Sequence, residues 1–432
     1  MRPAVLGLAF AATLAACAAA PDSKPAPFDT EADAYLSAAA EHGAFNGTVM
    51  LSRGGEVFHE GAYTVPGEVP ASMPVTMASQ FDMRSFSKLV AKLAVLQLES
   101  EGKIDRNAPV SRYVSGVPQG DRITIQHLMD NTSGFPREFS YLSKPSTEMS
   151  PADILWAIRG EALEFEPGTD SRYSNVGYQL LYLIIGEVTG ESFVRHVEKA
   201  IFEPAGMAGA GARFYSGRDN LTAFASGHEL EDGEIMEVPY TEDDGDFKTA
   251  ILFATAEDIH RFLLFAASGP FAGELANDEG MIAHAGGSTG KRAWGEVDRK
   301  TLNGVVFLAN YDEVAFGRMT KDLRALVDGE PYELIETVSR TAVSVPFELR
   351  KQYEGTYLFA EAGGLKLRVE ATEDGLAVYQ NGQLAGELQA ESETVFFADP
   401  ASPESFTFVR QESGEIVLLM DWQGVAWRGE RL

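Results

Sequence analysis

A serine and a lysine three positions apart are the first residues of this chain whose types and spacing suggest chemistry. In Ser85-Phe86-Ser87-Lys88 the serine and lysine side chains share one face of a helix, provided that a helix begins there. The first turn of a helix offers free N–H groups and partial positive charge, which stabilise an alkoxide and help to keep a nearby lysine neutral. A serine hydroxyl beside a neutral amine is an activated nucleophile. The motif therefore makes Ser85 a candidate nucleophile and Lys88 a candidate base.

A second motif, Tyr173-Ser174-Asn175, stands just before an apolar run from Val176 to Val188. A tyrosine close to one or two cations can give up its proton and carry it between a nucleophile and a leaving group. An amide such as Asn175 can hold Lys88 in place or bind a substrate carbonyl. Taken alone, the motif is far more typical of a helix-capping Ser-Asn pair beside a core tyrosine.

A third motif, His284-Ala285-Gly286-Gly287, precedes a segment that we expect to form a hairpin. Glycines at Gly286 and Gly287 let a strand backbone pass close to a bound acyl group and donate an N–H to its oxyanion. His284 is a candidate contact for the substrate or for the Tyr173 hydroxyl. The alternative is a surface histidine in a turn. The seven histidines have no metal-ligand spacing, and we expect no metal.

Two further patterns around Ser288 are interpreted as coincidences. Ser288-Thr289-Gly290-Lys291 repeats the Ser-x-x-Lys spacing, but it lies among glycines and no helix follows to hold Lys291 over the serine. Residues 286–290 also match Gly-x-Ser-x-Gly, the nucleophile turn of α/β-hydrolases. That fold requires a catalytic histidine later in the chain, and the last histidine here is His284.

The elements that must position these motifs follow from hydrophobic periodicity and turn residues. Two β-rich runs around Arg53-Gly54-Gly55 predict a hairpin over residues 45–59, and residues 304–310 predict a buried strand. A long helix is predicted after Ser85, ending at Gly102, with mainly helical structure over 105–202 and another helix over 256–265. The acidic stretch 229–248 predicts an exposed loop. From about Val345, turn signals every eight to twelve residues predict a small antiparallel sheet or barrel.

The N-terminal residues predict an exported protein, and the charge of the chain argues against two classes of partner. Residues 1–17 combine Arg2, a short apolar run and Leu14-Ala15-Ala16-Cys17, which is typical of a secretory signal peptide. Cys17 is the single cysteine, and the segment is similar to a bacterial lipobox in which that residue is lipidated. Residues 18–28 read as a tether. The net charge of −29 argues against nucleic acid as a partner and against electrostatic capture by anionic lipid.

The three motifs in this order resemble the penicillin-recognising serine hydrolases, in the branch that holds class C β-lactamases, D-stereospecific peptidases and related esterases. The resemblance spans about residues 30–325, including FDMRSFSKLVAKLAVLQLESEGKIDRNAPVSRYV and FEPGTDSRYSNVGYQLLYLIIGEVTGESF. It implies an α+β fold over residues 29–335: an antiparallel sheet flanked by helices, with a helical subdomain. Residues 345–432 resemble the lipocalin-like β domain that often follows.

The same resemblance implies roles for individual residues. Ser85 becomes the acylated nucleophile, Lys88 its proton acceptor, and Tyr173 the acid/base that acts on the leaving group and on the deacylating water. The oxyanion is expected to bind the backbone N–H groups of Ser85 and Gly287. No metal or organic cofactor is implied.

The chain departs from the family pattern at four places. His284 stands where penicillin-binding members usually have a lysine, which favours esters or D-configured peptides over β-lactams. Asn131 replaces a usual histidine, and Ala250-Ile251-Leu252 replaces a usual glycine pair. Eighteen residues separate Phe265 from His284, where the family usually has several dozen.

Two functions from different classes follow from these observations. The favoured one is an exported hydrolase, anchored to the periplasmic or cell-envelope membrane through Cys17, that cleaves small ester, amide or D-amino-acid peptide substrates through an acyl-enzyme on Ser85. The alternative is a non-catalytic or acyl-trapping envelope protein that binds peptidoglycan-like ligands, which the shortened segment and the added β domain would suit. The presence of Ser85, Lys88 and Tyr173 together favours the hydrolase, because a protein that only binds its ligand does not need all three.

Overall fold

The protein is described from a computed structural model, which covers residues 27–143, 149–213, 222–231, 233–238, 251–335, 339–360, 364–380, 382–398, 400, 404–411, 413–422 and 425–432. The predicted signal peptide and Cys17 lie outside the described residues. Helix α1 (Pro27–Glu41) takes in the last two residues predicted as tether. Across the described residues, no helix combines the length and the apolar character that crossing a bilayer requires.

Within the described residues, five antiparallel strands form the main sheet in the order β2-β1-β10-β9-β8. The hairpin predicted over residues 45–59 and the strand predicted over 304–310 are both present, as β1–β2 and β10. Strands β1 and β10 are buried on both faces, which is why their sequences are nearly continuous apolar runs. The bounds are β1 Gly47–Arg53, β2 Glu56–Tyr63, β8 Met281–Ser288, β9 Lys291–Asp298 and β10 Gly304–Ala309.

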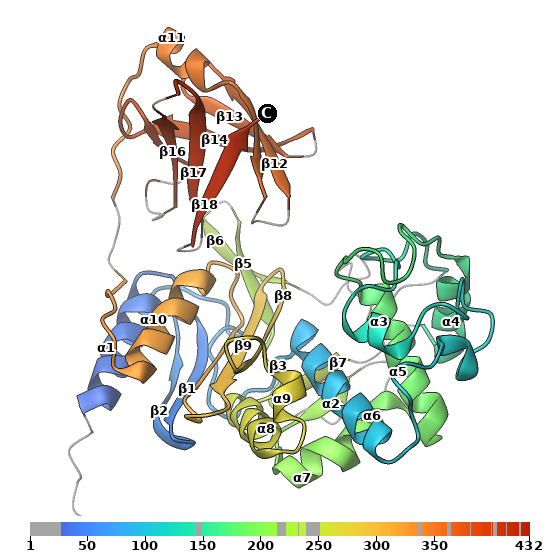
Figure 1. Ribbon diagram of the computed structural model, residues 1–432. Coiled ribbons are helices and arrows are strands. Elements are labelled where there is room, and N and C mark those ends of the chain that lie inside the picture. The colour runs from blue at the N-terminus through green and yellow to red at the C-terminus, as the bar shows by residue number, and fades with distance from the viewer. Residues whose placement is uncertain are drawn as a thin grey trace, which may run out of the picture.

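Helices cover the two faces of this sheet, as Figure 1 shows. On one face, α1 and α10 (Phe316–Asp328) bury Tyr35, Leu36 and Leu323 against Phe307 of β10 and Phe45, which precedes β1. On the other face lie α8 (Ala256–Ser268) and α2 (Ser87–Ser100), within a larger apolar core. The helix predicted after Ser85 is therefore confirmed, as is the one predicted over residues 256–265.

A helical subdomain follows α2 and packs against it, mainly through α5 and α6 (Figure 1). Its elements are η2 Val110–Arg112, α3 Ile125–Met129, α4 Pro151–Gly160, α5 Asn175–Thr189, α6 Phe193–Val197, the π-helical turn Glu198–Phe202 and α7 Glu203–Ala205. A three-stranded sheet of β3 (Phe81–Asp82), β7 (Ile251–Ala254) and β4 (Gly211–Arg213), counted over the described residues, lies beside the start of α2.

The predicted exposed loop over residues 229–248 is wrong for its first part. Residues Gly227–Glu231 form β5 and Glu234–Val238 form β6, which pair as an antiparallel hairpin. The loop prediction rests on the acidic charge of the stretch, and β6 gives no clear strand signal because apolar Ile235 and Met236 are adjacent and do not alternate with polar residues. Residues 239–250, including the Ala250 departure, lie outside the described residues.

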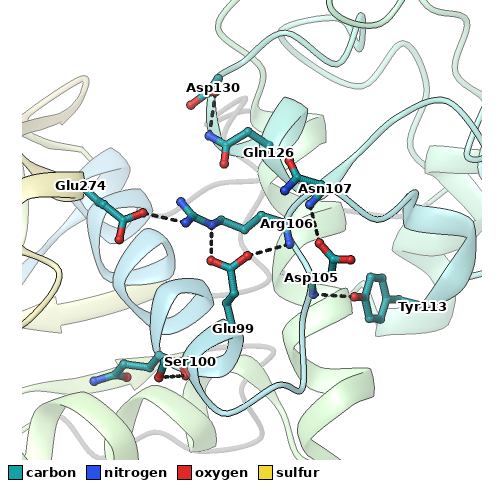
Figure 2. Close-up of polar contacts among 10 residues, drawn as sticks. Glu99, Ser100, Asp105, Arg106, Asn107, Tyr113, Gln126, Asp130 and Glu274 are labelled. Atoms are coloured by element: carbon teal, nitrogen blue, oxygen red, sulfur yellow. Dashed lines mark hydrogen bonds and ion pairs between the residues drawn. The ribbon is translucent and has the colours of Figure 1, made fainter.

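The shortened segment before β8 is folded and anchored to the rest of the domain. It contains α9 (Ala272–Leu275), and Glu274 of α9 lies 2.7 Å from the Arg106 guanidinium. The same guanidinium bonds Glu99 near the end of α2 at 2.5 Å, so that Arg106 lies between the two carboxylates, as Figure 2 shows. This brace ties α9 to the helix that begins beside Ser85.

The C-terminal residues form a closed antiparallel barrel, which confirms the β domain predicted from turn spacing. Its described residues contribute eight strands in sequential order around apolar side chains such as Tyr357, Phe359, Phe396 and Leu418. The short helix α11 (Phe347–Arg350) and the turn Lys351–Tyr353 precede it. The strands are β11 Gly355–Phe359, β12 Leu365–Ala371, β13 Leu376–Gln380, β14 Gln383–Ala390, β15 Val395–Phe397, β16 Ser405–Arg410, β17 Ile416–Trp422 and β18 Val425–Arg431.

Candidate active site

Ser85 lies in a tight turn, η1 (Arg84–Phe86), that leads directly into α2. The residue before it, Arg84, has a φ of 46°, a left-handed conformation that is costly for a side chain of this size. Two contacts with buried Asp82 hold it there: the Arg84 N–H donates to Oδ1 and Nε lies 2.9 Å from Oδ2. The fold thus maintains backbone strain next to the predicted nucleophile.

Lys88 is buried one helical turn after Ser85 and points at it. Its Nζ lies 3.2 Å from Ser85 Oγ, as the spacing of three along a helix predicts, and it donates to Asn175 Oδ1 at 2.8 Å. The side chain is 6% exposed. A buried amine with an oxygen on one side and the serine hydroxyl on the other is suitably placed to exchange a proton with that hydroxyl.

Tyr173 completes a three-membered contact around the serine. Its hydroxyl lies 2.5 Å from Ser85 Oγ. Two cations flank the ring, with Lys88 Nζ 4.8 Å and Arg137 Cζ 5.3 Å from its centroid. The expectation that one or two cations lie near this tyrosine agrees with this geometry, although Arg137 was not anticipated.

Asn175 is the first residue of α5, and both ends of its amide are engaged by protein groups. Oδ1 accepts from Lys88, and Nδ2 donates to Glu138 Oε1 at 2.7 Å. Of the two alternatives open at Asn175, these contacts correspond to holding Lys88. Sequence reasoning missed Glu138: it precedes Asn175 by 37 residues, and no periodicity links positions so far apart.

Asn131, one of the departures from the family pattern, supports the loop that carries Tyr173. Its Oδ1 accepts from the Ser174 N–H at 3.0 Å and its carbonyl oxygen from the Arg172 N–H at 2.8 Å. It has a φ of 57°, a left-handed conformation that asparagine tolerates better than most residues. Ser174 in turn caps α5 by accepting from the Gly177 N–H.

His284 projects from β8 toward the start of α2, and its ring centroid lies 6.5 Å from that of Phe86. Its Nδ1 is 2.6 Å from the Ala285 carbonyl oxygen, and because a carbonyl only accepts, Nδ1 carries the proton. Burial lowers the pKa of His284 to about 4, and the charges of Lys88 and Lys92 act in the same direction. The imidazole is therefore neutral at neutral pH, unlike the lysine usual at this position.

The two glycines of the third motif lie differently. A Cβ on Gly286 would fall 2.2 Å from the Met83 carbonyl oxygen, so β8 passes η1 at a distance that only glycine allows. Ser288 pairs with Lys291 across a two-residue turn, and such closing pairs exchange hydrogen bonds. One residue earlier, the Gly287 N–H points away from β9 instead. Within the described residues, β8 is an edge strand, so this N–H faces the free edge of the sheet.

The second Ser-x-x-Lys copy has a different geometry from the first. Ser288 and Lys291 lie on opposite strands of the β8–β9 hairpin, and no helix follows Ser288. In the part of the chain that the structure describes, the Ser288 hydroxyl makes no hydrogen bond, so Lys291 does not contact it as Lys88 contacts Ser85. Across the same part, no three acidic, histidine or cysteine side chains gather as a metal site would require.

Comparisons with known proteins agree with this geometry. Residues 32–279 match the family model described as Beta-lactamase. The chain is 26% identical to penicillin-binding protein 4* of Bacillus subtilis over 430 residues, covering 87% of this chain and 93% of that one. Among solved structures, a D-amino acid amidase from Ochrobactrum anthropi, complexed with L-phenylalanine amide, aligns with a TM-score of 0.56 at 18% identity. That alignment covers 69% of this chain and 98% of the amidase. A class C β-lactamase aligns with a TM-score of 0.57 at 16% identity, over 73% and 99% of the two chains.

Proposed function

Because the chain belongs to the β-lactamase family, we propose that it is a serine hydrolase that cleaves ester or amide bonds through an acyl-enzyme on Ser85. The observation that carries this proposal is the meeting of three groups from two separate segments. Ser85 Oγ lies 3.2 Å from Lys88 Nζ and 2.5 Å from the Tyr173 hydroxyl. A nucleophile needs one partner to take its proton and a second to serve the leaving group, and this site holds both.

The reaction runs in two steps, and the second step returns Lys88 and Tyr173 to the protonation states that they had before the first. In acylation, Lys88 takes the Ser85 proton as Oγ attacks the acyl carbon, and Tyr173 gives its proton to the departing oxygen or nitrogen. The N–H groups of Ser85 and Gly287 stabilise the oxyanion. In deacylation, Tyr173 takes a proton from the attacking water, and Lys88 returns its proton to Oγ as the acyl group leaves.

The substrates that fit best are esters and amides, including D-amino-acid peptides. The neutral His284 supplies no cation on β8 to bind the carboxylate of a β-lactam, so β-lactam turnover is expected to be poor. The likeness to a D-amino acid amidase is consistent with an amide substrate.

The alternative of a non-catalytic envelope protein rested partly on the shortened segment before His284. That segment is folded and braced by Arg106, and β8 beyond it meets η1 closely at Gly286. The shortened segment therefore gives no reason to regard the site around Ser85 as disabled. Acylation without turnover remains the behaviour that would distinguish an acyl-trapping protein from a hydrolase.

The site of action is proposed from the N-terminal residues alone. Residues 1–17 as a signal peptide and lipidation of Cys17 would place the enzyme in the periplasm or cell envelope, tethered to a membrane. Expression with radiolabelled palmitate in a bacterial host tests this. Label in the wild type and not in a Cys17→Ser variant supports the anchor, whereas an unlabelled wild type removes it.

Fluorophosphonate labelling of residues 18–432 tests the proposed function. The adduct should be found on Ser85 by peptide mass, should be absent from Ser85→Ala, and should persist in Ser288→Ala as the matched control. Labelling would be followed by turnover of p-nitrophenyl esters, D-amino-acid amides and nitrocefin. A folded protein that labels on Ser288, or on neither serine, contradicts the assignment; stoichiometric acylation without turnover supports the acyl-trapping alternative.

A further inference from the structure

A chain of three polar contacts runs from Glu138 to the nucleophile. Glu138 Oε1 accepts from Asn175 Nδ2 at 2.7 Å, and Asn175 Oδ1 accepts from Lys88 Nζ at 2.8 Å. The same Nζ lies 3.2 Å from Ser85 Oγ. Glu138 thus acts on the serine through two intermediates and does not touch it.

Glu138 determines which way round the Asn175 amide lies. The oxygen and nitrogen of a primary amide are nearly equal in size, so rotation by 180° fits the same space. A carboxylate only accepts hydrogen bonds, and it therefore binds the nitrogen of the amide. With Nδ2 held by Glu138, Oδ1 has to face Lys88.

The direction of the amide matters because Lys88 must be neutral to act as a base. A neutral amine has two N–H bonds and one lone pair. When Asn175 presents its oxygen, it accepts one N–H, and the lone pair stays available for the Ser85 proton. In the rotated amide, Nδ2 would donate to that lone pair and occupy the base.

The loop that carries Glu138 is fixed to the start of α5, which makes this orientation part of the fold. The Asn175 N–H donates to the Arg137 carbonyl oxygen at 2.9 Å, and the Ser174 hydroxyl donates to the Pro136 carbonyl oxygen at 2.7 Å. The loop and the helix therefore move together, and the carboxylate keeps its distance to the amide.

We propose that Glu138 is a positioning residue for acylation: its carboxylate holds the Asn175 amide with the oxygen toward Lys88, so that the lone pair of Lys88 faces Ser85. This inference rests on the proposed function, with Ser85 as nucleophile and Lys88 as base. It adds a residue from outside the three sequence motifs to the machinery of the reaction.

Replacement of Glu138 by glutamine is the direct test, because glutamine keeps the size and removes the fixed polarity. A glutamine can donate to Asn175 Oδ1 as readily as it can accept from Nδ2. We expect the second-order rate constant for fluorophosphonate labelling of Ser85 to fall by about tenfold to a hundredfold, the effect of losing a hydrogen bond to a charged group. Glu138→Asp, which retains a carboxylate, should recover part of the rate. Glu166→Gln is the matched control, since exposed Glu166 pairs with Arg122 away from the site.

The pH profile separates orientation from a simple charge effect. Glu138 Oε1 also lies 3.5 Å from Nε of Arg137, whose guanidinium is beside the Tyr173 ring, so removal of the carboxylate leaves the site more positive. A pure charge effect would therefore favour the developing oxyanion and make Glu138→Gln label faster at neutral pH. Loss of orientation makes it slower at every pH between 6 and 10. The probe carries no amino group, so slower labelling is not loss of a substrate contact.

Three outcomes would overturn the inference. Labelling of Glu138→Gln within twofold of the wild type would show that the orientation is not needed, and faster labelling at neutral pH would show a charge effect. A raised KM confined to amine-bearing substrates, with normal labelling, would make Glu138 a substrate ligand. Failure of the wild type to label would instead contradict the proposed function, so the two failures are distinguishable. Thermal melting of each variant identifies loss of labelling that comes from unfolding.

Discussion

Acidification should destabilise the protein through His284, and replacement by asparagine should remove that part of the pH dependence. The imidazole is partly buried on β8, and its pKa is lowered to about 4 from the ordinary 6.5. Between these values the unfolded chain binds a proton that the folded chain does not. The free energy of unfolding therefore rises with pH from about 4 to 6.5, and the stability is fully present above this window.

The size of the effect follows from the two pKa values. At pH 5.0 the difference in proton binding corresponds to a loss of about 2 kcal/mol relative to pH 7.5. The side chain retains some contact with solvent, and this water weakens the effects of burial and of nearby charges on the imidazolium. We therefore expect a measured contribution of about 1–2 kcal/mol. Asparagine cannot take up a proton in this range, and its amide is able to donate to the Ala285 carbonyl as Nδ1 does.

The assay is urea denaturation of residues 18–432 at pH 7.5 and 5.0, at constant ionic strength, for the wild type and His284→Asn. Other groups that titrate in this range contribute equally to both proteins and cancel in the comparison. The wild type should lose about 1–2 kcal/mol more than the variant on acidification. Equal losses would refute the reasoning, because they would show that the pKa of His284 is the same in the folded and the unfolded chain.

Three further changes have defined outcomes. Lys88→Ala should slow labelling and turnover by about 10²–10⁴-fold, the usual contribution of a positioned base, and a loss under tenfold would point to another proton acceptor. Gly286→Ala should lower the melting temperature and labelling far more than Gly386→Ala, because a Cβ at Gly386 meets nothing within 4 Å; similar behaviour of the two would contradict the close packing at β8. Arg106→Ala should cost about 1 kcal/mol of stability through loss of the brace in Figure 2, while Arg112→Ala, whose ion pair is exposed, should cost nothing measurable.

Several departures from the family pattern acquire a physical meaning only in the folded chain. Asn131, expected merely as a substitution, holds the loop before Tyr173 through two backbone hydrogen bonds. The shortened segment before β8, which would have suited a non-catalytic protein, forms α9 and is braced to α2. In both cases the compensating partner lies far away in sequence, where neither spacing nor composition could indicate it.

The sequence by itself determined the parts of this protein that depend on neighbours along the chain. The i, i+3 spacing brought the Ser85 and Lys88 side chains together where η1 leads into α2, one glycine pair located the first hairpin, and regular turn signals predicted the C-terminal barrel. These features follow from helical and strand periods, which are local properties of the backbone.

Only the tertiary structure decided how the separate segments meet. It placed the Tyr173 hydroxyl against Ser85, added Glu138 behind Asn175, and turned the acidic stretch after Gly227 into a hairpin. Such contacts form because buried surfaces and polar groups from distant segments must satisfy one another in the core, and the periodicity of residues along the chain does not specify those pairings.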